Sequence, residues 1–219
     1  PFAMYHVDPD HKEREFLTLD ELTAMTEIKL EDPNMAFARD LFVFGCWTGI
    51  SFIDTKNLTE DKISMINGAP WIVSKRQKTG VPFQVKLMDI PMRIVERYKP
   101  LRKDCHLFNI GRLDTINKRI KKVAAMCGIK KRISYHVSRH TFAVLSLEYG
   151  MPIETVSKIL GHTNITTTQI YAKVTSSKLE HDISVFESRI KGHLPTMGGM
   201  ALDLCRLYRG HTAHITHSA

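Results

Sequence analysis

Apolar and polar positions follow a helical period in the first part of the chain. Residues 34–47 form a run apolar enough to predict a buried helix, which Gly49 would end in a left-handed turn. Before this run, Thr18 is followed three residues later by Glu21, a spacing typical of a capping box that opens a helix. The folded part of the chain is therefore predicted to begin with helices.

From Lys62 the period shortens to that of β-strands. The runs KISMI, PWIVSKRQ and PFQVKL are β-prone and are separated by the turn sequences NGA and KTGV. They predict an antiparallel sheet of three strands. Beyond the sheet the helical period returns in residues 88–98, 112–128, 134–150, 152–161 and 176–190. The predicted fold class is mainly α with a small three-stranded antiparallel β-sheet.

Length and composition indicate one principal domain. With 219 residues and 43% apolar residues, the chain can bury a sizeable core. We interpret residues 1–16, which lack periodicity, as a linker and residues 17–191 as the folded domain. Residues 192–219 carry Gly, Pro and scattered histidines without a clear pattern, which predicts a flexible tail.

Charge is distributed unevenly and points to a polyanionic partner. The net charge is +8, but residues 1–35 carry −6 (three bases, nine acids) whereas residues 74–139 carry +14 (18 bases, four acids). Such clustering favours nucleic acid over the alternative of an ordinary solvated surface. The densest part is a helical stretch and the residues after it, whose bases are Lys118, Arg119, Lys121, Lys122, Lys130, Lys131 and Arg132.

The sequence contains few signals of export or of a metal site. The four cysteines are far apart and form no C-x-x-C pair, so we interpret them as reduced thiols. No apolar run is long enough for a membrane helix, and no signal peptide is visible. We therefore expect a cytoplasmic protein that needs no metal or other cofactor, although the tail histidines leave a metal site open as a minor alternative.

Four residues of distinctive chemistry follow one another at wide spacing. His136 and Arg139 would share a helix face, where they could bind a phosphate or form an ordinary helix surface with a salt-bridging arginine. His162 follows a glycine at a predicted helix end and could be a structural cap. Tyr171 could be a packed phenol or a nucleophile. Individually these residues decide nothing.

Together they match a known order. The pattern H-x-x-R, then 23 residues to His162 and nine to Tyr171, with the flanks HTFA, LGHT and TTQIYA, resembles the tyrosine recombinase (phage integrase) family. The resemblance runs from about residue 17 to 190. It implies that residues 17–191 are a catalytic domain and that residues 1–16 are the linker from a missing N-terminal DNA-binding domain.

The resemblance also implies the reaction. Tyr171 would attack a DNA phosphate, form a 3′-phosphotyrosyl bond and release a 5′-hydroxyl, with Arg139, His136 and His162 as further catalytic residues. Lys78 stands at the junction of a predicted strand and turn, where the family keeps a lysine that protonates the leaving oxygen. A turn lysine without a catalytic role is the alternative at that position.

One position departs from the family pattern. Where the family has a first catalytic arginine, this chain reads Thr-Gly-Ile-Ser, with Ser51 in the arginine's place. Such a serine resembles a subgroup of integrases carried by conjugative transposons of gut anaerobes. We nominate Arg76 as the replacement, because on the predicted strand its side chain would point the same way as that of Lys78, two residues later. Alternatively, Arg76 contacts only the DNA backbone, or the enzyme is crippled.

The remaining expectations concern DNA and partners. We group Ser51, Lys75 and His140 with the seven bases of residues 118–132 as DNA-contacting residues. The resemblance implies double-stranded DNA as substrate, a homotetramer on DNA through exchange of the C-terminal helix, a possible monomer when free, accessory DNA-bending proteins, and integration or excision of a mobile element at bacterial nucleoid DNA. The rival functions are a type IB topoisomerase and a non-enzymatic helix-turn-helix protein that uses residues 152–171.

Overall fold

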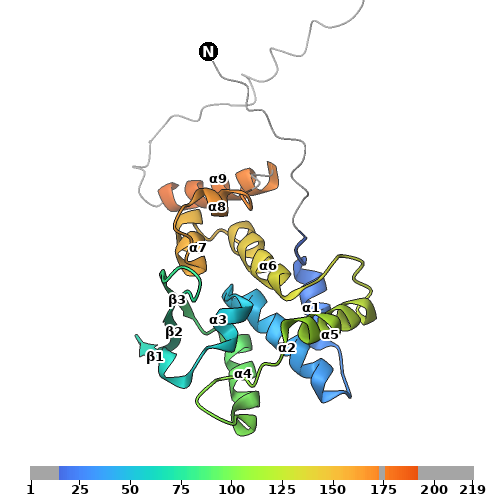
Figure 1. The fold of residues 1–219 in the computed structure, drawn as a ribbon. Coiled ribbons are helices and arrows are strands. Elements are labelled where there is room, and N and C mark those ends of the chain that lie inside the picture. Colours follow the sequence, from blue (N-terminus) through green and yellow to red (C-terminus); the bar gives the residue numbers. More distant parts are fainter. Residues whose placement is uncertain (1–14, 173–175, 192–219) are drawn as a thin grey trace, which may run out of the picture. The chain divides into compact units, whose positions relative to one another are not determined.

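The computed structural model describes residues 15–172 and 176–191 (Figure 1). Its α-helices are α1 (Leu19–Glu27), α2 (Pro33–Thr48), α3 (Phe52–Lys56), α4 (Asp89–Tyr98), α5 (Leu113–Met126), α6 (Tyr135–Glu148), α7 (Ile153–Leu160), α8 (Thr166–Gln169) and α9 (Ser176–Lys191). Its strands are β1 (Ile63–Ile66), β2 (Ala69–Lys75) and β3 (Pro82–Lys86), and its 3-10 helices are η1 (Glu60–Lys62) and η2 (Lys99–Leu101). Apart from residues 15 and 16, the predicted linker and tail lie outside the described residues. The predicted fold class is confirmed.

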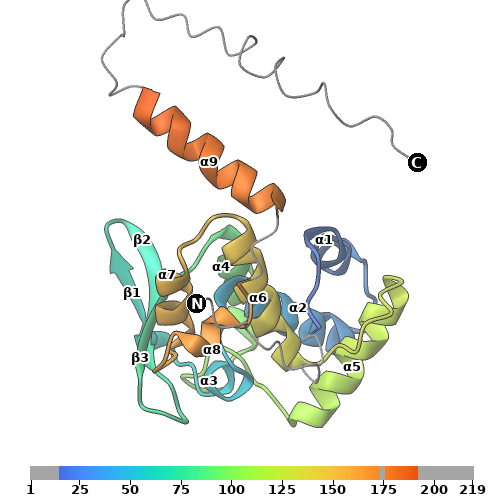
Figure 2. The same cartoon turned by 90° about the horizontal axis from the view of Figure 1, so that it is seen from above.

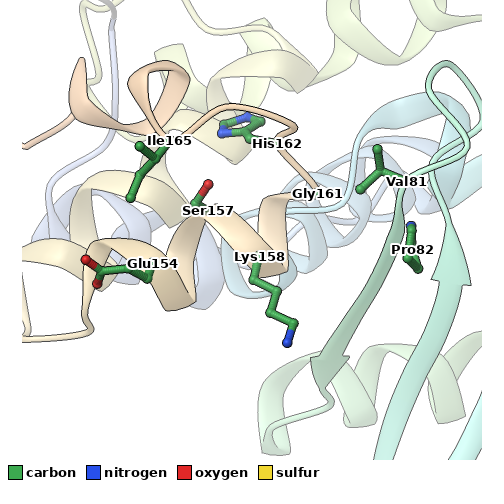
Figure 3. A pocket seen from close by; sticks show the side chains of 8 residues that line it. All are labelled: Val81, Pro82, Glu154, Ser157, Lys158, Gly161, His162 and Ile165. Atoms are coloured by element: carbon green, nitrogen blue, oxygen red, sulfur yellow. The ribbon is translucent and has the colours of Figure 1, made fainter.

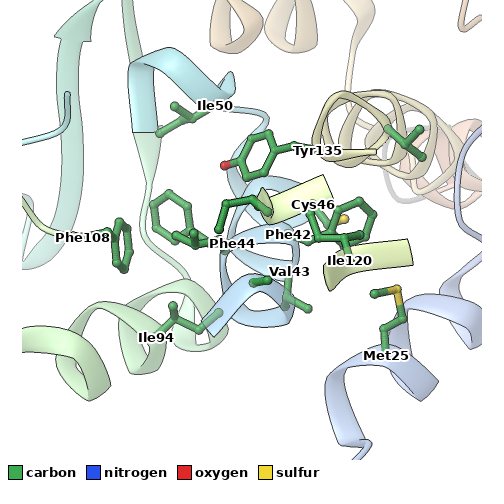
Figure 4. Packing of buried hydrophobic residues seen from close by; sticks show 14 of the residues in the cluster. Met25, Phe42, Val43, Phe44, Cys46, Ile50, Ile94, Phe108, Ile120 and Tyr135 are labelled. Carbon is green, nitrogen blue, oxygen red and sulfur yellow. The ribbon is translucent and has the colours of Figure 1, made fainter. Parts of the chain in front are cut away.

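Helix α2 forms the centre of the main core. It contacts α1, α4, α5 and α6, and Figure 4 shows Phe42 and Phe44 of α2 among side chains from those helices. Each fully buried phenylalanine of this kind contributes roughly 1.5–3 kcal/mol. Asp32 caps the first turn, and Gly49 ends the helix in the left-handed conformation (φ 65°) that the sequence predicts.

The sheet has the order β1-β2-β3, with both neighbouring pairs antiparallel. Asn67 (φ 49°) and Gly68 (φ 75°) form the two-residue turn between β1 and β2, because both residue types tolerate left-handed backbone. Strand β3 alternates, with Phe83 and Val85 buried, and α7 packs against this strand (Figure 2). The β2–β3 hairpin is thereby held next to α7.

A second, smaller apolar cluster joins α6 to α7. Its buried members are Phe142, Ala143, Leu147, Val156 and Leu160. Tyr171 packs against this cluster. The C-terminal end of α2 also meets it, since a Cβ on Gly49 would lie 2.6 Å from the ring of Phe142. The ends of α2 and α7 and the body of α6 therefore converge at one place.

Helices α7 and α8 do not form the helix pair that the helix-turn-helix alternative needs. Helix α8 contains four residues, Thr166–Gln169, which amount to about one turn and about 6 Å of helix. A recognition helix must present several side chains along a DNA groove. Helix α8 is too short for this purpose, so the fold disfavours that alternative.

Helix α9 belongs to a unit separate from the preceding elements. Considered by itself, it has an apolar face on which Ile183 is 49% exposed and Phe186 is 63% exposed. No helix among the described residues has both the length and the hydropathy required to cross a membrane.

Candidate active site

Arg76 is buried just after β2, where the turn of the β2–β3 hairpin begins. It is 6% exposed, and its guanidinium carbon lies 3.9 Å from the centroid of the Phe83 ring. Its Nη1 donates to Asp54 Oδ2 at 3.0 Å, and its Nη2 donates to the Ile159 carbonyl at 2.8 Å. Its Nε is also buried but has no hydrogen-bond partner. The Arg76 guanidinium is therefore buried with one carboxylate partner and one donor unused.

Gly161 allows Arg76 to occupy this position. Gly161 ends α7 with φ 61°, and a Cβ there would lie 2.8 Å from Arg76 Nε. Any other residue would combine left-handed strain with a steric clash. Strand β3 lies against α7, and Gly161 of the LGHT motif leaves room for the Arg76 side chain to pack against the end of this helix.

Asp54 connects the hairpin to the position where the family pattern is broken. Ser51 caps α3 and donates its hydroxyl to Asp54 Oδ2 at 2.6 Å, the same oxygen that Arg76 binds. The backbone N–H of Gln77 donates to Asp54 Oδ1 at 2.8 Å. The Ser51 hydroxyl and the Arg76 guanidinium therefore meet at one carboxylate oxygen.

Arg139 projects from α6 to the ends of two other helices. Its Nη1 donates to the Gly49 carbonyl at 2.8 Å, just beyond α2, and its Nη2 donates to the Leu160 carbonyl at 2.6 Å, at the end of α7. Burial, together with the charge of Arg76, lowers the pKa of Arg139 to about 10. Two carbonyls fix the guanidinium without neutralising it.

His162 follows Gly161 and is half-buried. Its Nδ1 lies 2.8 Å from the Thr168 hydroxyl of α8. Burial and the positive charges of Arg139 and Arg76 lower the pKa of His162 to about 4. The imidazole is therefore neutral at pH 7. Arg76, Arg139 and His162 together form what we call the cationic cluster, in which Asp54 only partly offsets two guanidinium charges.

A hollow of about 370 Å³ opens next to the cationic cluster. It lies between the β2–β3 hairpin and α7, and Figure 3 shows Val81 and Pro82 of the hairpin across from Gly161 and His162. A ligand in the hollow would reach the imidazole of His162.

Tyr171, just beyond α8, meets a histidine of α6. The hydroxyl of Tyr171 lies 2.6 Å from Nδ1 of His140. His140 is 6% exposed, and the exposed ring of His136 packs against it edge-on at a centroid distance of 4.3 Å. The sequence pattern grouped His140 with the DNA-contacting residues, but its burial puts it beneath the surface. No local signal in the sequence could have placed it, because its contact with Tyr171 joins positions 31 apart.

The two hairpin lysines are at the surface. Lys75 is the last residue of β2, and Lys78 lies in the turn of residues 77–79; both are exposed. The expectation that Arg76 and Lys78 point the same way along a strand is wrong, because β2 ends before either residue. One is buried and the other is exposed at the hairpin turn.

The basic stretch covers one face of α5 and the residues after it. Ile116, Ile120, Val123 and Ala124 form the buried stripe. Lys118, Lys121, Lys122, Lys130 and Arg132 are exposed, whereas Arg119 is half-buried. Lys131 differs from them, since its ammonium donates to Glu21 and to the Phe16 carbonyl at 2.9 Å. Lys131 therefore ties the start of α1 to the domain.

One group of potential metal ligands occurs within the described ranges. Asp104, Cys105 and His106 could each offer an atom, and these atoms lie within 4.8 Å of one another. The group is in the loop after η2, and none of the predicted catalytic residues belongs to it.

Comparison with known proteins shows the family of this chain. The sequence model of the phage integrase family matches residues 15–178, most of the chain. The chain belongs to the phage integrase family. The match covers every described element from α1 to α8.

Individual tyrosine recombinases also match much of this chain. The tyrosine recombinase XerD of Oceanobacillus iheyensis is 26% identical over 192 residues, which are 80% of this chain and 64% of that protein. XerC of Serratia marcescens is 26% identical over 179 residues, 78% of this chain and 58% of that protein. The chain therefore spans about three fifths of the length of these curated relatives.

Solved structures of family members share the fold. A crystal structure of XerA recombinase has a TM-score of 0.63 and 25% identity, covering 86% of this chain and 66% of that one. A post-cleavage complex of the XerH recombinase with its difH substrate has a TM-score of 0.66 and 20% identity, covering 80% and 54%. The Tn1549 transposon integrase, in complex with circular intermediate DNA, has a TM-score of 0.61 and 17% identity, covering 81% and 68%.

Proposed function

We propose that this chain contains the catalytic domain of a site-specific DNA recombinase. The hydroxyl oxygen of Tyr171 attacks a DNA phosphorus and forms an O–P bond, so that the tyrosine is esterified to the 3′ phosphate. The bond between that phosphorus and the 5′ oxygen breaks. A 5′-hydroxyl from a partner strand then attacks the same phosphorus and releases the tyrosine. The bond energy stays in the protein–DNA ester, so the reaction needs no nucleotide cofactor.

The unbalanced charge of the cationic cluster carries this proposal. Arg76 and Arg139 are close enough for the charge of Arg76 to lower the pKa of Arg139, and Asp54 offsets only part of their charge. A phosphate would supply the missing negative charge. It would also gain more stabilisation in the transition state, where further charge builds up on its oxygens. Tyr171, whose hydroxyl lies 2.6 Å from Nδ1 of His140 on the same helix as Arg139, is the nucleophile of this arrangement.

Within this function, Arg76 takes the role of the family arginine that Ser51 replaces. Arg76 and Ser51 bind the same oxygen of Asp54, so the guanidinium reaches the region that the residue-51 side chain faces. The burial of Arg76 and its unpaired Nε favour this role over a contact with the DNA backbone at the surface.

The other candidate residues have complementary roles. His136 and His162 would bind the phosphate oxygens from either side of Arg139. Lys78, exposed in the hairpin turn, would protonate the leaving 5′ oxygen, a general acid role that typically contributes ~10²–10⁴-fold.

We place double-stranded DNA against the basic face of α5 and the hairpin. The exposed bases of that face, Lys75 and the phosphate contacts of the cationic cluster supply the charge. Helix α9, with its exposed Phe186 and Ile183, is suited to dock on a neighbouring subunit in a tetramer on DNA. The biological role in this proposal is the integration and excision of a mobile element, with DNA-bending proteins as accessories.

A covalent trapping assay tests the proposal. Selection from random duplexes with the full-length protein supplies a binding site, and a nicked version of that site lets the cleaved end diffuse away. We expect a denaturant-resistant protein–DNA adduct that the Tyr171→Phe variant does not form. Binding without any adduct would indicate a regulator. Relaxation of supercoiled plasmid without paired sites would indicate a topoisomerase.

A further inference from the structure

The attack of Tyr171 releases a proton that needs an acceptor. A phenol with a pKa near 10 is mostly protonated at neutral pH, so the O–H bond must break as the O–P bond forms. Arg139 is cationic and cannot accept this proton. An acceptor for this proton has to lie within hydrogen-bonding distance of the Tyr171 hydroxyl.

His140 is located where such an acceptor is needed. Its Nδ1 lies 2.6 Å from the Tyr171 hydroxyl oxygen, within the distance over which a general base acts. In the tautomer with hydrogen on Nε2, the phenol donates to the lone pair of Nδ1. The ring is 6% exposed, so water has little access to compete for this position.

The partners of this hydrogen bond are both held in place. Helix α6 carries His140, and the edge of the His136 ring packs against it. The Tyr171 ring packs against the α6–α7 apolar cluster, and its backbone N–H donates to the Thr168 carbonyl at 3.0 Å. His140 also directly follows Arg139 on α6. In the proposed reaction Arg139 binds the phosphate and His140 contacts the nucleophile Tyr171.

We infer that His140 is a further catalytic residue, the proton acceptor for Tyr171; this inference rests on the proposed function. In the cleavage step the Tyr171 O–H proton passes to Nδ1 of His140 while the Tyr171 oxygen bonds to phosphorus, and the 5′ oxygen leaves with a proton from Lys78. In the reverse step the attacking 5′-hydroxyl gives its proton to Lys78 as its oxygen bonds to phosphorus, and the imidazolium returns its proton to the departing phenolate. No oxidant, metal or other reactant is required.

Two substitutions separate proton acceptance from simple positioning. His140→Asn retains a hydrogen-bond acceptor near the place of Nδ1, but an amide oxygen does not take up a proton at neutral pH. His140→Phe removes both functions and keeps a ring of similar size. We expect both variants to form the adduct about 10²-fold more slowly in single turnover while binding the selected DNA site as wild type does.

A more acidic nucleophile provides the decisive measurement. Installing 3,5-difluorotyrosine at position 171 makes loss of the phenol proton easier without a base. We expect it to restore at least about ten-fold of the lost rate in both His140 variants, and to change the wild-type rate much less. Val137→Ala, a packing change on the same helix but in the main core, serves as the control. It should lower thermal stability and show no such rescue.

The possible results divide cleanly. A wild-type rate in His140→Asn, an absent rescue by difluorotyrosine, or faster cleavage in His140→Phe each overturns the inference while leaving the proposed function intact. If the wild-type protein forms no Tyr171-dependent adduct, the proposed function fails and the inference fails with it.

Discussion

Two buried aspartates bind arginines in this protein, and the two assemblies differ in how far their positive charge is buried. In the main core, Asp40 accepts from Arg39 Nε at 2.5 Å, from Arg97 Nη1 at 2.7 Å and from the Tyr98 hydroxyl at 2.8 Å. Arg39 also donates to three carbonyls at the C-terminal end of α1, the closest at 2.8 Å. Hydrogen bonds therefore use both carboxylate oxygens and tie α1, α2 and α4 together.

The assembly around Asp54 has similar groups but a different balance. Asp54 accepts from Ser51, Arg76 and Gln77, yet Arg76 Nε remains without a partner and Arg139 adds a second positive charge. The pKa values differ accordingly. The hydrogen bond to Asp40 raises the pKa of Arg97, whereas burial lowers that of Arg76 although Asp54 opposes the shift. Each assembly sets two guanidinium groups against one carboxylate, but the side chain of Arg97 is 59% exposed to solvent, whereas that of Arg76 is 6% exposed. The positive charge around Asp54 is therefore the less solvated one and has more to gain from an anionic ligand.

The largest expected effect comes from removing the unbalanced charge. Arg76→Ala should slow formation of the covalent DNA adduct by about 10²–10³-fold, because it deletes one donor to the charge that develops on the phosphate. DNA affinity, measured in parallel by fluorescence anisotropy, should change little. Adduct formation at the wild-type rate would show that Arg76 is not the replacement for the missing arginine.

The matched control is Arg39, the buried arginine that binds Asp40. Arg39→Ala should lower the free energy of unfolding by about 3–5 kcal/mol, because Asp40 loses a buried partner. Once the protein is folded, its adduct rate should match wild type. Arg76→Ala should cost less stability than this, since its loss also relieves repulsion with Arg139. Chemical denaturation of both variants makes the comparison, and the reverse order of stabilities would contradict it.

A smaller effect is expected at Gly161, where backbone conformation and a steric contact combine. Gly161→Ala adds a Cβ at 2.8 Å from Arg76 Nε at a backbone φ of 61°. It should cost about 1–3 kcal/mol of stability and also slow adduct formation, because Arg76 must move. Gly150→Ala provides the control, since Gly150 has a φ of 86° and nothing within 4 Å of an added Cβ. That variant should show strain alone, with a normal adduct rate.

The local sequence was sufficient for the elements and for part of the site. The capping box at Thr18, the turn at Gly49 and the three strands depend on neighbouring residues, so the pattern predicts them. The order and spacing of His136, Arg139, His162 and Tyr171 identify the family because this pattern is read directly along the sequence. The side chains that hold the site together depend instead on contacts between distant segments.

Arg76 illustrates the limit. In the sequence it is a basic residue at the end of a strand, typical of a DNA contact. It is buried because α7, some 80 positions further on, places Gly161 and the Ile159 carbonyl against the hairpin. The position of His140 likewise depends on Tyr171 folding back onto α6. No local period encodes either contact.

The smallest expected effect is a titration, and it measures the charge imbalance directly. By NMR, His162 in the DNA-free protein should titrate near a pKa of about 4, below its ordinary value, because of burial and the charges of Arg139 and Arg76. Between pH 6.5 and 4 the unfolded chain takes up a proton at this histidine and the folded chain does not. The contribution of His162 to stability is therefore lost as the pH falls through that window. Arg76→Ala should raise the titration midpoint, whereas Arg39→Ala should leave it in place. An unchanged midpoint in Arg76→Ala would mean that burial and the charge of Arg139 lower the pKa of His162 without Arg76, and Arg76 would then lose its place in the cationic cluster.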